Sequence, residues 1–173
     1  MTLVPVIETE RLRLRGFRAE DLDAFAAFFA SERSRFVGGP RDRRESWRGM
    51  TAIMGQWALL GYGLWAVEER ASGALAGAVG IVNHVGWEEP ELGYHLYDGF
   101  EGRGLAFEAA QAARLHAARH FGLDRLISYI DPANARSLAL ARRLGAVHER
   151  DGELLGKPCQ VWRHPAVAEA VPA

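Results

Sequence analysis

Two glycines separated by one residue join a strand-like segment to a long run of helix-forming residues. Of all the features in the sequence, this junction most strongly limits which fold the chain can adopt. Residues 91–97, ELGYHLY, have the length and composition of a strand. The residues from Gly102 to about Phe121 predict a long helix that Gly122 ends. A strand that leads through Gly102 and Gly104 into a helix is typical of a layered domain in which helices cover a sheet.

The rest of the sequence predicts further strands and helices. Residues 10–15 alternate arginine and leucine, which is typical of a half-buried strand. Strands are also predicted at residues 64–69, 74–84, 125–130, 147–150 and 159–163, and helices at 20–30, 42–57 and 133–144. This order indicates a single domain over residues 1–173, an α/β (α+β layered) fold with helices on both sides of a mixed sheet. We expect its core at about residues 8–163 and a loose tail at 164–173.

Composition excludes several classes of protein. The 173 residues carry a net charge of −1, so no overall positive field attracts nucleic acid or an anionic membrane. Arginines are dense between residues 33 and 48, but acidic residues are interleaved with them, which indicates a solvated helical surface. Cys159 is the only cysteine, and no apolar run approaches the ~20 residues of a membrane helix. We expect a cytoplasmic monomer or homodimer.

The glycine junction has several possible functions. A Walker loop needs lysine and serine or threonine after its last glycine, where Leu105 and Ala106 stand. A dinucleotide fingerprint needs a third small residue where Phe107 stands. Two interpretations stay open: a nest of backbone N–H groups from Gly102 to Phe107 that binds a pyrophosphate, and a plain strand-to-helix turn.

The wider pattern favours the first interpretation. Residues 101–106, EGRGLA, resemble the acyl-CoA loop of the GCN5-related N-acetyltransferases (GNAT), whose pattern is Gln/Arg-x-x-Gly-x-Gly/Ala. The sequence TERLRLR at 9–15, the R-x-x-D at 18–21, the strand ELGYHL and the N-x-x-S helix that ends in LG resemble the RimJ/RimL-like branch in the same order. The resemblance covers about residues 8–163. Glu101 departs from the pattern, and its carboxylate disfavours an anion slightly.

This resemblance implies a fold, a co-substrate and a set of binding residues. The fold is a central mixed, mostly antiparallel sheet with helices on both faces. The co-substrate is acetyl-CoA, and the acceptor is a primary amine on a protein N-terminus or a small molecule. Contacts with the co-substrate are expected from Leu96, Tyr97, Asp98, Gly102, Arg103, Gly104, Leu105, Ala106, Phe107, Asn134 and Ser137. The pantetheine amides would pair with backbone groups that the strand from Leu92 to Tyr97 leaves open.

Three residues are candidates for the chemistry of acyl transfer. Glu91 begins the strand before the glycines and would act as general base, directly or through water, although an exposed strand-end carboxylate explains it as well. His84 is a second candidate base, or a strand-end histidine without a role. Ser137 would return a proton to the thiolate while Asn134 binds the pantetheine region, unless Asn134 only caps the helix and Ser137 is a neutral surface residue.

Two functions of different classes remain open. The first is an N-acetyltransferase that acts directly in a ternary complex, and the second is a noncatalytic acyl-CoA-binding or sensing module. His116 and His120 have the i, i+4 spacing of a helical metal pair, but Ala117 stands where a zincin has glutamate. We therefore expect no metal.

Overall fold

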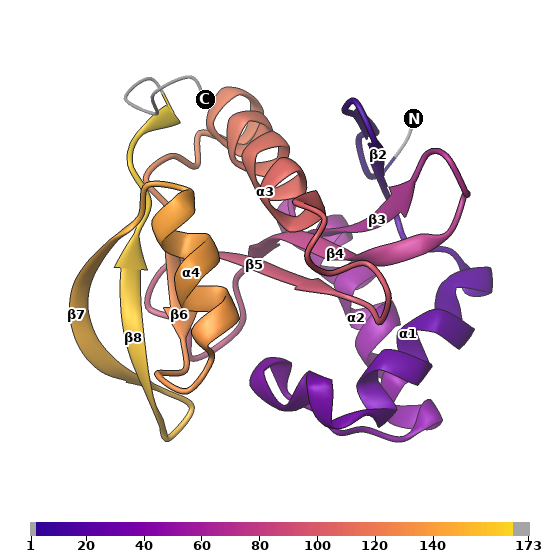
Figure 1. The fold of residues 1–173 in the computed structure, drawn as a ribbon, viewed down its shortest axis with the longest axis horizontal. Coiled ribbons are helices and arrows are strands. Elements are labelled where there is room, and N and C mark those ends of the chain that lie inside the picture. Colours follow the sequence, from indigo (N-terminus) through magenta and orange to yellow (C-terminus); the bar gives the residue numbers. More distant parts are fainter. Residues whose placement is uncertain (1–2, 168–173) are drawn as a thin grey trace.

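A computed structural model describes residues 3–167 and shows one eight-stranded sheet flanked by helices (Figure 1). The strands are β1 Ile7–Glu8, β2 Leu12–Arg15, β3 Leu64–Glu69, β4 Leu75–Val82, β5 Glu91–Leu96, β6 Ile127–Ile130, β7 Val147–Leu154 and β8 Lys157–Arg163. The helices are α1 Leu22–Ala30, α2 Arg43–Leu60, α3 Leu105–His116 and α4 Ala135–Arg143. Two short 3₁₀ helices are η1 Ala19–Asp21 and η2 Glu32–Val37, and a π-helical segment, η3 Ala117–Phe121, continues α3. No helix in this part of the chain could span a membrane.

The sheet has the order β1-β2-β3-β4-β5-β6-β8-β7. All its neighbours are antiparallel except β5 and β6, which run parallel and share a single pair, Glu91 with Ile127. The expected mixed, mostly antiparallel sheet is therefore confirmed. Beyond that pair the two strands separate, so β1–β5 and β6–β8 form two wings (Figure 1).

Alternation along the central strands gives the sheet two apolar faces. Trp65 and Val67 of β3 pack in the cluster that contains the small residues of α3, whereas Ala66 packs in the cluster formed with α1 and α2. The alanines of α3 let the helix approach the sheet closely, and the phenylalanines of α1 fill the opposite face. Helices thus cover both faces, as expected, and β5 lies between α3 and α1.

Several predicted boundaries are wrong by a few residues. The helix predicted from Gly102 begins at Leu105, because both glycines have positive φ, +73° and +77°, outside the helical region. The strand predicted to residue 84 ends at Val82, so His84 lies in the following loop. The two strands predicted at the C-terminus are longer and form a hairpin that turns at Leu155 and Gly156.

The segment after β8 is not loose over residues 164–167. His164 is fully buried, its backbone N–H donates to Leu126 O at 2.9 Å, and its Nε2 lies 2.9 Å from Ser128 Oγ. Arg114 of α3 donates to Pro165 O at 2.6 Å. Burial lowers the pKa of His164 to about 3, so the ring packs as a neutral group. The rest of the predicted tail, residues 168–173, lies outside the described residues.

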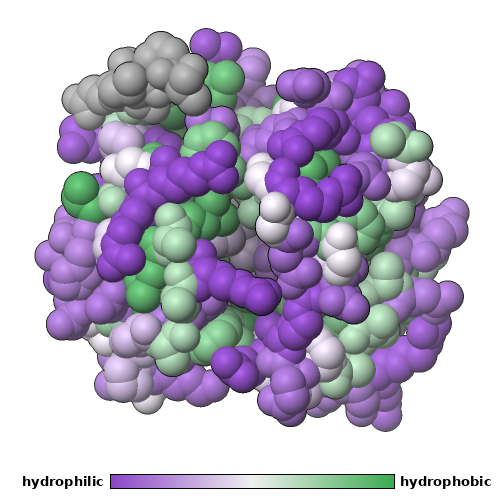
Figure 2. Space-filling view, viewed as in Figure 1, coloured by the Kyte–Doolittle hydropathy of each residue, from purple (hydrophilic) through white to green (hydrophobic). Residues whose placement is uncertain are grey.

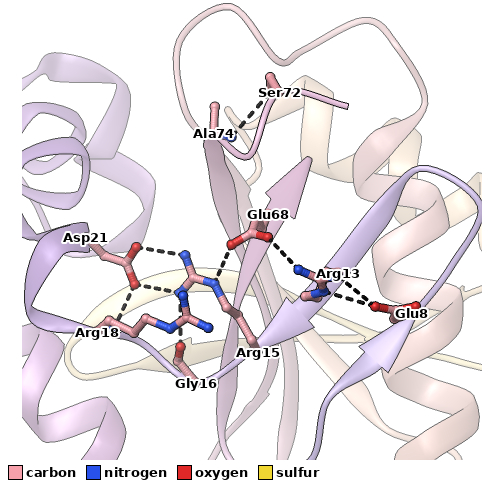
Figure 3. Close-up of polar contacts among 9 residues, drawn as sticks. All are labelled: Glu8, Arg13, Arg15, Gly16, Arg18, Asp21, Glu68, Ser72 and Ala74. Carbon is pink, nitrogen blue, oxygen red and sulfur yellow. Dashed lines mark hydrogen bonds and ion pairs between the residues drawn. The ribbon is translucent and has the colours of Figure 1, made fainter. Parts of the chain in front are cut away.

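The arginine–leucine alternation in β2 separates apolar from ionic contacts. Leu12 and Leu14 are fully buried in the core. On the other face, Arg15 donates to both carboxylate oxygens of Asp21, at 2.7 and 2.9 Å, and to Glu68 at 2.7 Å (Figure 3). Asp21 also accepts the backbone N–H of residue 18 at 2.8 Å. The R-x-x-D motif therefore attaches the start of α1 to the sheet through a buried ion triad.

Candidate functional site

The separation of β5 from β6 places the candidate residues around one opening. Ser128 of β6 donates to Leu92 O of β5 at 2.8 Å, which closes the base of the opening next to the Glu91–Ile127 pair. The surface is recessed near its centre, between the wing that contains α4 and the wing that contains α1 and α2 (Figure 2). Glu91, the glycine turn and the start of α4 all adjoin the separated strands.

The open edge of β5 has fewer free backbone groups than the sequence predicts. The N–H of Tyr97 donates to Ala76 O of β4 at 2.8 Å, so residues 91, 93, 95 and 97 bond toward β4 by antiparallel alternation. Leu92, Tyr94 and Leu96 face the opening. Among their carbonyls, Leu92 O accepts from Ser128 and Leu96 O accepts from Arg33 at 3.1 Å. The Tyr94 amide groups and the Leu96 N–H remain, and Tyr97 is not on this edge.

The glycine turn presents its amides at the start of α3. The first backbone hydrogen bond of the helix runs from Glu108 N to Gly104 O at 3.2 Å, so the N–H groups of Leu105, Ala106 and Phe107 precede the helical pattern. A Cβ atom at Gly102 would meet nothing within 4 Å, so this side of the turn is open. The ring of Phe107 lies against the guanidinium of Arg143 of α4. The turn fits a diphosphate.

Residues of the TERLRLR segment hold this turn in place through Glu108, which the sequence analysis missed. Thr9 Oγ1 donates to Glu108 Oε1 at 2.6 Å, and the Arg11 N–H donates to the same oxygen at 2.9 Å. Arg11 also donates to Glu108 Oε2 at 2.7 Å and to Arg103 O at 2.7 Å. Arg103 pairs with Glu69 of β3. The turn between β1 and β2 thus fixes the glycine turn from a distance of about 90 to 100 residues in the sequence.

Glu101 has its charge matched by two arginines. Arg33 of η2 pairs with its carboxylate, and Arg136 of α4 lies 3.3 Å from the same oxygen. Arg33 also pairs with the exposed side chain of Asp98 at 3.2 Å. The two arginines therefore compensate the negative charge by which Glu101 departs from the GNAT pattern. Through these ion pairs Glu101 links both wings to the glycine turn.

The start of α4 places Ser137 against β5. Asn134 is the N-cap, and its Oδ1 accepts the Ser137 N–H at 3.2 Å. Ser137 is half-buried, and its Oγ donates to Tyr94 Oη at 3.2 Å, while Tyr94 Oη donates to Ser137 O at 3.2 Å. Burial raises the pKa of Tyr94 to about 12, so the phenol keeps its proton at neutral pH. Asn134 is a helix cap, but Ser137 is not a neutral surface residue.

Glu91 is enclosed where β5 and β6 begin to separate. Its Oε2 accepts from Trp87 Nε1 at 2.8 Å and its Oε1 from the Tyr129 N–H at 3.1 Å. Burial raises its pKa from 4.5 to about 7, although the two hydrogen bonds oppose the shift. It is therefore not an exposed strand-end carboxylate. Sequence periodicity gave no sign of either partner, since one lies in a loop and the other on β6.

His84 lies apart from this enclosure. Its side chain is exposed, and its ring contacts Trp87 with the ring centres 4.9 Å apart. Although the residue is exposed overall, partial desolvation of its ring and the charge of Arg41 lower its pKa. Trp87 thus contacts both candidate bases, but only Glu91 bonds to it.

Comparisons with known proteins agree with this geometry. A family model described as an acetyltransferase (GNAT) domain matches residues 11–147. The chain belongs to the GNAT acetyltransferase family. An acetyltransferase from Agrobacterium tumefaciens str. C58 is 36% identical, with a TM-score of 0.86 over 93% of this chain and 94% of that one.

Other solved GNAT structures connect the chain to the ribosomal-protein branch. A putative ribosomal-protein-serine acetyltransferase from Vibrio cholerae is 25% identical, with a TM-score of 0.78 over 96% of this chain and 99% of that one. The fold is also shared by RimL, a ribosomal L7/L12 alpha-N-protein acetyltransferase in complex with coenzyme A, at 18% identity and a TM-score of 0.77 over 95% and 100% of the two chains. The expected superfamily and its RimJ/RimL-like branch are confirmed.

Proposed function

We propose that this GNAT protein transfers an acetyl group from acetyl-CoA to a primary amine, on a protein N-terminus or a small molecule, directly in a ternary complex. The buried carboxylate of Glu91 supports this most strongly, because its pKa of about 7 suits a base that works at neutral pH. A cytoplasmic location and a monomeric or dimeric state stay predictions.

Acetyl-CoA would bind across α3, α4 and the open edge of β5. The amides of Leu105, Ala106 and Phe107 would bind the pyrophosphate, aided by the positive end of the helix dipole. The remaining backbone groups of Tyr94 and Leu96 would pair with the pantetheine. One of these N–H groups is the natural donor to the oxyanion of the tetrahedral intermediate.

Glu91 and Ser137 would divide the proton transfers. Glu91, ionised, takes a proton from the ammonium group, directly or through water, and the neutral amine attacks the thioester carbonyl carbon. When the carbon–sulfur bond breaks, Ser137 Oγ gives its proton to the thiolate. Tyr94 can restore that proton, because its hydroxyl lies 3.2 Å from Ser137 Oγ and is protonated at neutral pH. The attacking nitrogen loses its second proton as the amide forms, and that proton returns through water to the phenol of Tyr94. Cys159 has no part in this scheme, since no acyl-enzyme forms.

The test is incubation with acetyl-CoA and a panel of amines, including N-terminal peptides and polyamines, with release of free CoA measured. We expect CoA release with at least one amine. Calorimetric binding of CoA without release on any amine would favour the noncatalytic module instead. Gly104→Val should weaken CoA binding, because Gly104 has a φ of +77° and the turn must approach the ligand. Unchanged affinity in a folded variant would contradict the placement of the pyrophosphate.

The two candidate bases can be separated by their pH profiles. Glu91→Gln should lower kcat/KM most at neutral pH and remove the limb with a midpoint near 7. His84→Asn should keep that limb. The opposite pattern would assign the base to His84, and an unchanged profile in both variants would mean that the amine arrives neutral.

A further inference from the structure

Arg41 is held in a fixed position between η2 and α2 without a carboxylate partner. Its backbone N–H donates to Phe29 O at 2.7 Å, and its Nε donates to Gly38 O at 2.9 Å. Its guanidinium carbon lies 4.9 Å from the centre of the Phe29 ring. Nearby Arg33 and Arg43 each pair with an aspartate, whereas no acidic side chain in residues 3–167 forms an ion pair with Arg41.

The surrounding residues leave room for this guanidinium. A Cβ atom at Gly38 would lie 2.6 Å from Arg41 Nη2, and one at Gly49 would lie 3.0 Å from Nη1. Two glycines and an aromatic ring therefore surround the group, and its Nη atoms make no hydrogen bond within the described chain. A half-buried arginine with a fixed orientation and unused donors is suited to a planar anion such as a carboxylate.

Contacts connect Arg41 to the face of β5 on which Glu91 lies. The Phe29 ring beneath it meets the ring of His95, with the centres 5.6 Å apart. Glu91 and His95 are four residues apart on one strand, so they share a face and are about 13 Å apart. The charge of Arg41 adds to burial in lowering the pKa of both His84 and His95.

His95 supplies a second unused polar atom on this face. Its Nε2 is buried and has no hydrogen-bond partner within the described chain. Its ring stacks on Phe28 with the centres 4.8 Å apart, and burial lowers its pKa to about 4. The ring is therefore neutral at pH 7, and one of its two nitrogens can still donate or accept a hydrogen bond.

We propose that Arg41 binds a carboxylate of the acceptor, so that the preferred amine is a peptide N-terminus followed closely by an acidic residue. This inference rests on the proposed function, in which Glu91 receives the proton of the amine. The separation of Glu91 and His95 along β5, about 13 Å, favours a carboxylate on a side chain close to the peptide N-terminus. The α-carboxylate of a free amino acid is too close to its own amine to reach Arg41 while the amine lies at Glu91.

The test compares kcat/KM for peptides that differ only in charge, such as Ala-Glu-Ala-Ala amide and Ala-Gln-Ala-Ala amide, at low ionic strength. The wild-type enzyme should prefer the acidic peptide roughly tenfold or more, as expected for a charge-assisted hydrogen bond. Arg41→Gln should lower kcat/KM for the acidic peptide far more than for the neutral peptide, and so remove the preference. Arg48→Gln, which removes an exposed arginine of α2, should keep the preference.

The outcomes separate the two proposals. CoA release that is equal for both peptides in the wild-type enzyme would overturn the role of Arg41 and leave acetyl transfer intact. The comparison needs no variant, so a folding defect in Arg41→Gln cannot hide this result. Faster acetylation of free glutamate than of either peptide would overturn the proposed spacing. Failure to acetylate any amine would count against the proposed function itself.

Discussion

The burial of Glu91 predicts that the same carboxylate lowers the stability of the fold above neutral pH. Its pKa is about 7 in the folded protein against 4.5 in its ordinary state. Between these two values the folded state holds a proton that the unfolded state has lost, so the free energy of unfolding falls as pH rises. The contribution is fully present below pH 4.5 and is lost as pH rises through 7.

The magnitude follows from the size of the shift. A difference of about 2.5 pH units at 1.36 kcal/mol per unit corresponds to about 3 kcal/mol. Glu91→Gln removes the ionisation but keeps only one acceptor oxygen for two donors, so either Trp87 Nε1 or the Tyr129 N–H faces the amide NH2. That mismatch adds a cost that does not depend on pH. The informative quantity is therefore the change with pH in the stability difference between the variant and the wild type.

Urea unfolding at a series of pH values from 4.5 to 8.5 measures this difference. Relative to wild type, Glu91→Gln should gain about 3 kcal/mol across the series, and it should lose acetyltransferase activity at neutral pH. Glu153→Gln, the same substitution on the exposed face of β7, controls for the loss of one negative charge. Curves for Glu91→Gln and wild type that stay parallel would refute the burial of an ionisable group at this position.

Three further predictions concern other parts of the site and its support. Glu101→Gln should tighten CoA binding about two- to fivefold by calorimetry, because it removes an anion beside a helix N-terminus; weaker binding would mean that its ion pairs position the turn. Ser137→Ala should lower kcat by up to ~100-fold with little change in acetyl-CoA affinity, and wild-type kcat where chemistry limits the rate would exclude it. Arg15→Met should cost about 3–5 kcal/mol in urea unfolding, because Asp21 and Glu68 lose a buried partner; a cost no greater than that of the half-exposed Arg13→Met would contradict this.

The features that could be predicted from the sequence are those set by nearby residues. The glycines 102 and 104, the helix that follows them and the alternation in β2 depend on local conformational preference, so the order of the predicted elements is confirmed, although the two-residue strand β1 was not predicted. The residues at which helices and strands begin and end depend less on nearby sequence. The start of α3 was misplaced because glycines with positive φ look the same in a sequence as glycines inside a helix.

The candidate site depends on contacts that no local pattern reveals. Glu108 binds Arg11 and Thr9, which precede it in the sequence by 97 and 99 positions. In its local sequence Glu108 looks like any other acidic residue of a helix. The pKa of Glu91 depends on its enclosure beside Trp87 and Tyr129, so a period-two pattern could suggest the residue but not its chemistry. His164 was assigned to a tail because the sequence after β8 has no periodicity, yet Ser128 fixes it.

The alternation of β5 gives a physical reason why one strand can serve two substrates. Tyr94 lies on the face toward α3 and α4, where it contacts Ser137, and the proposed thioester would lie on that side. Glu91 and His95 lie on the opposite face with the aromatic residues of α1, where the proposed amine would arrive. Because the side-chain period of a strand is two, a shift of register by one residue would exchange the two sets. The base and the acid can therefore act from opposite sides of one strand, and the reaction would take place where β6 separates from it.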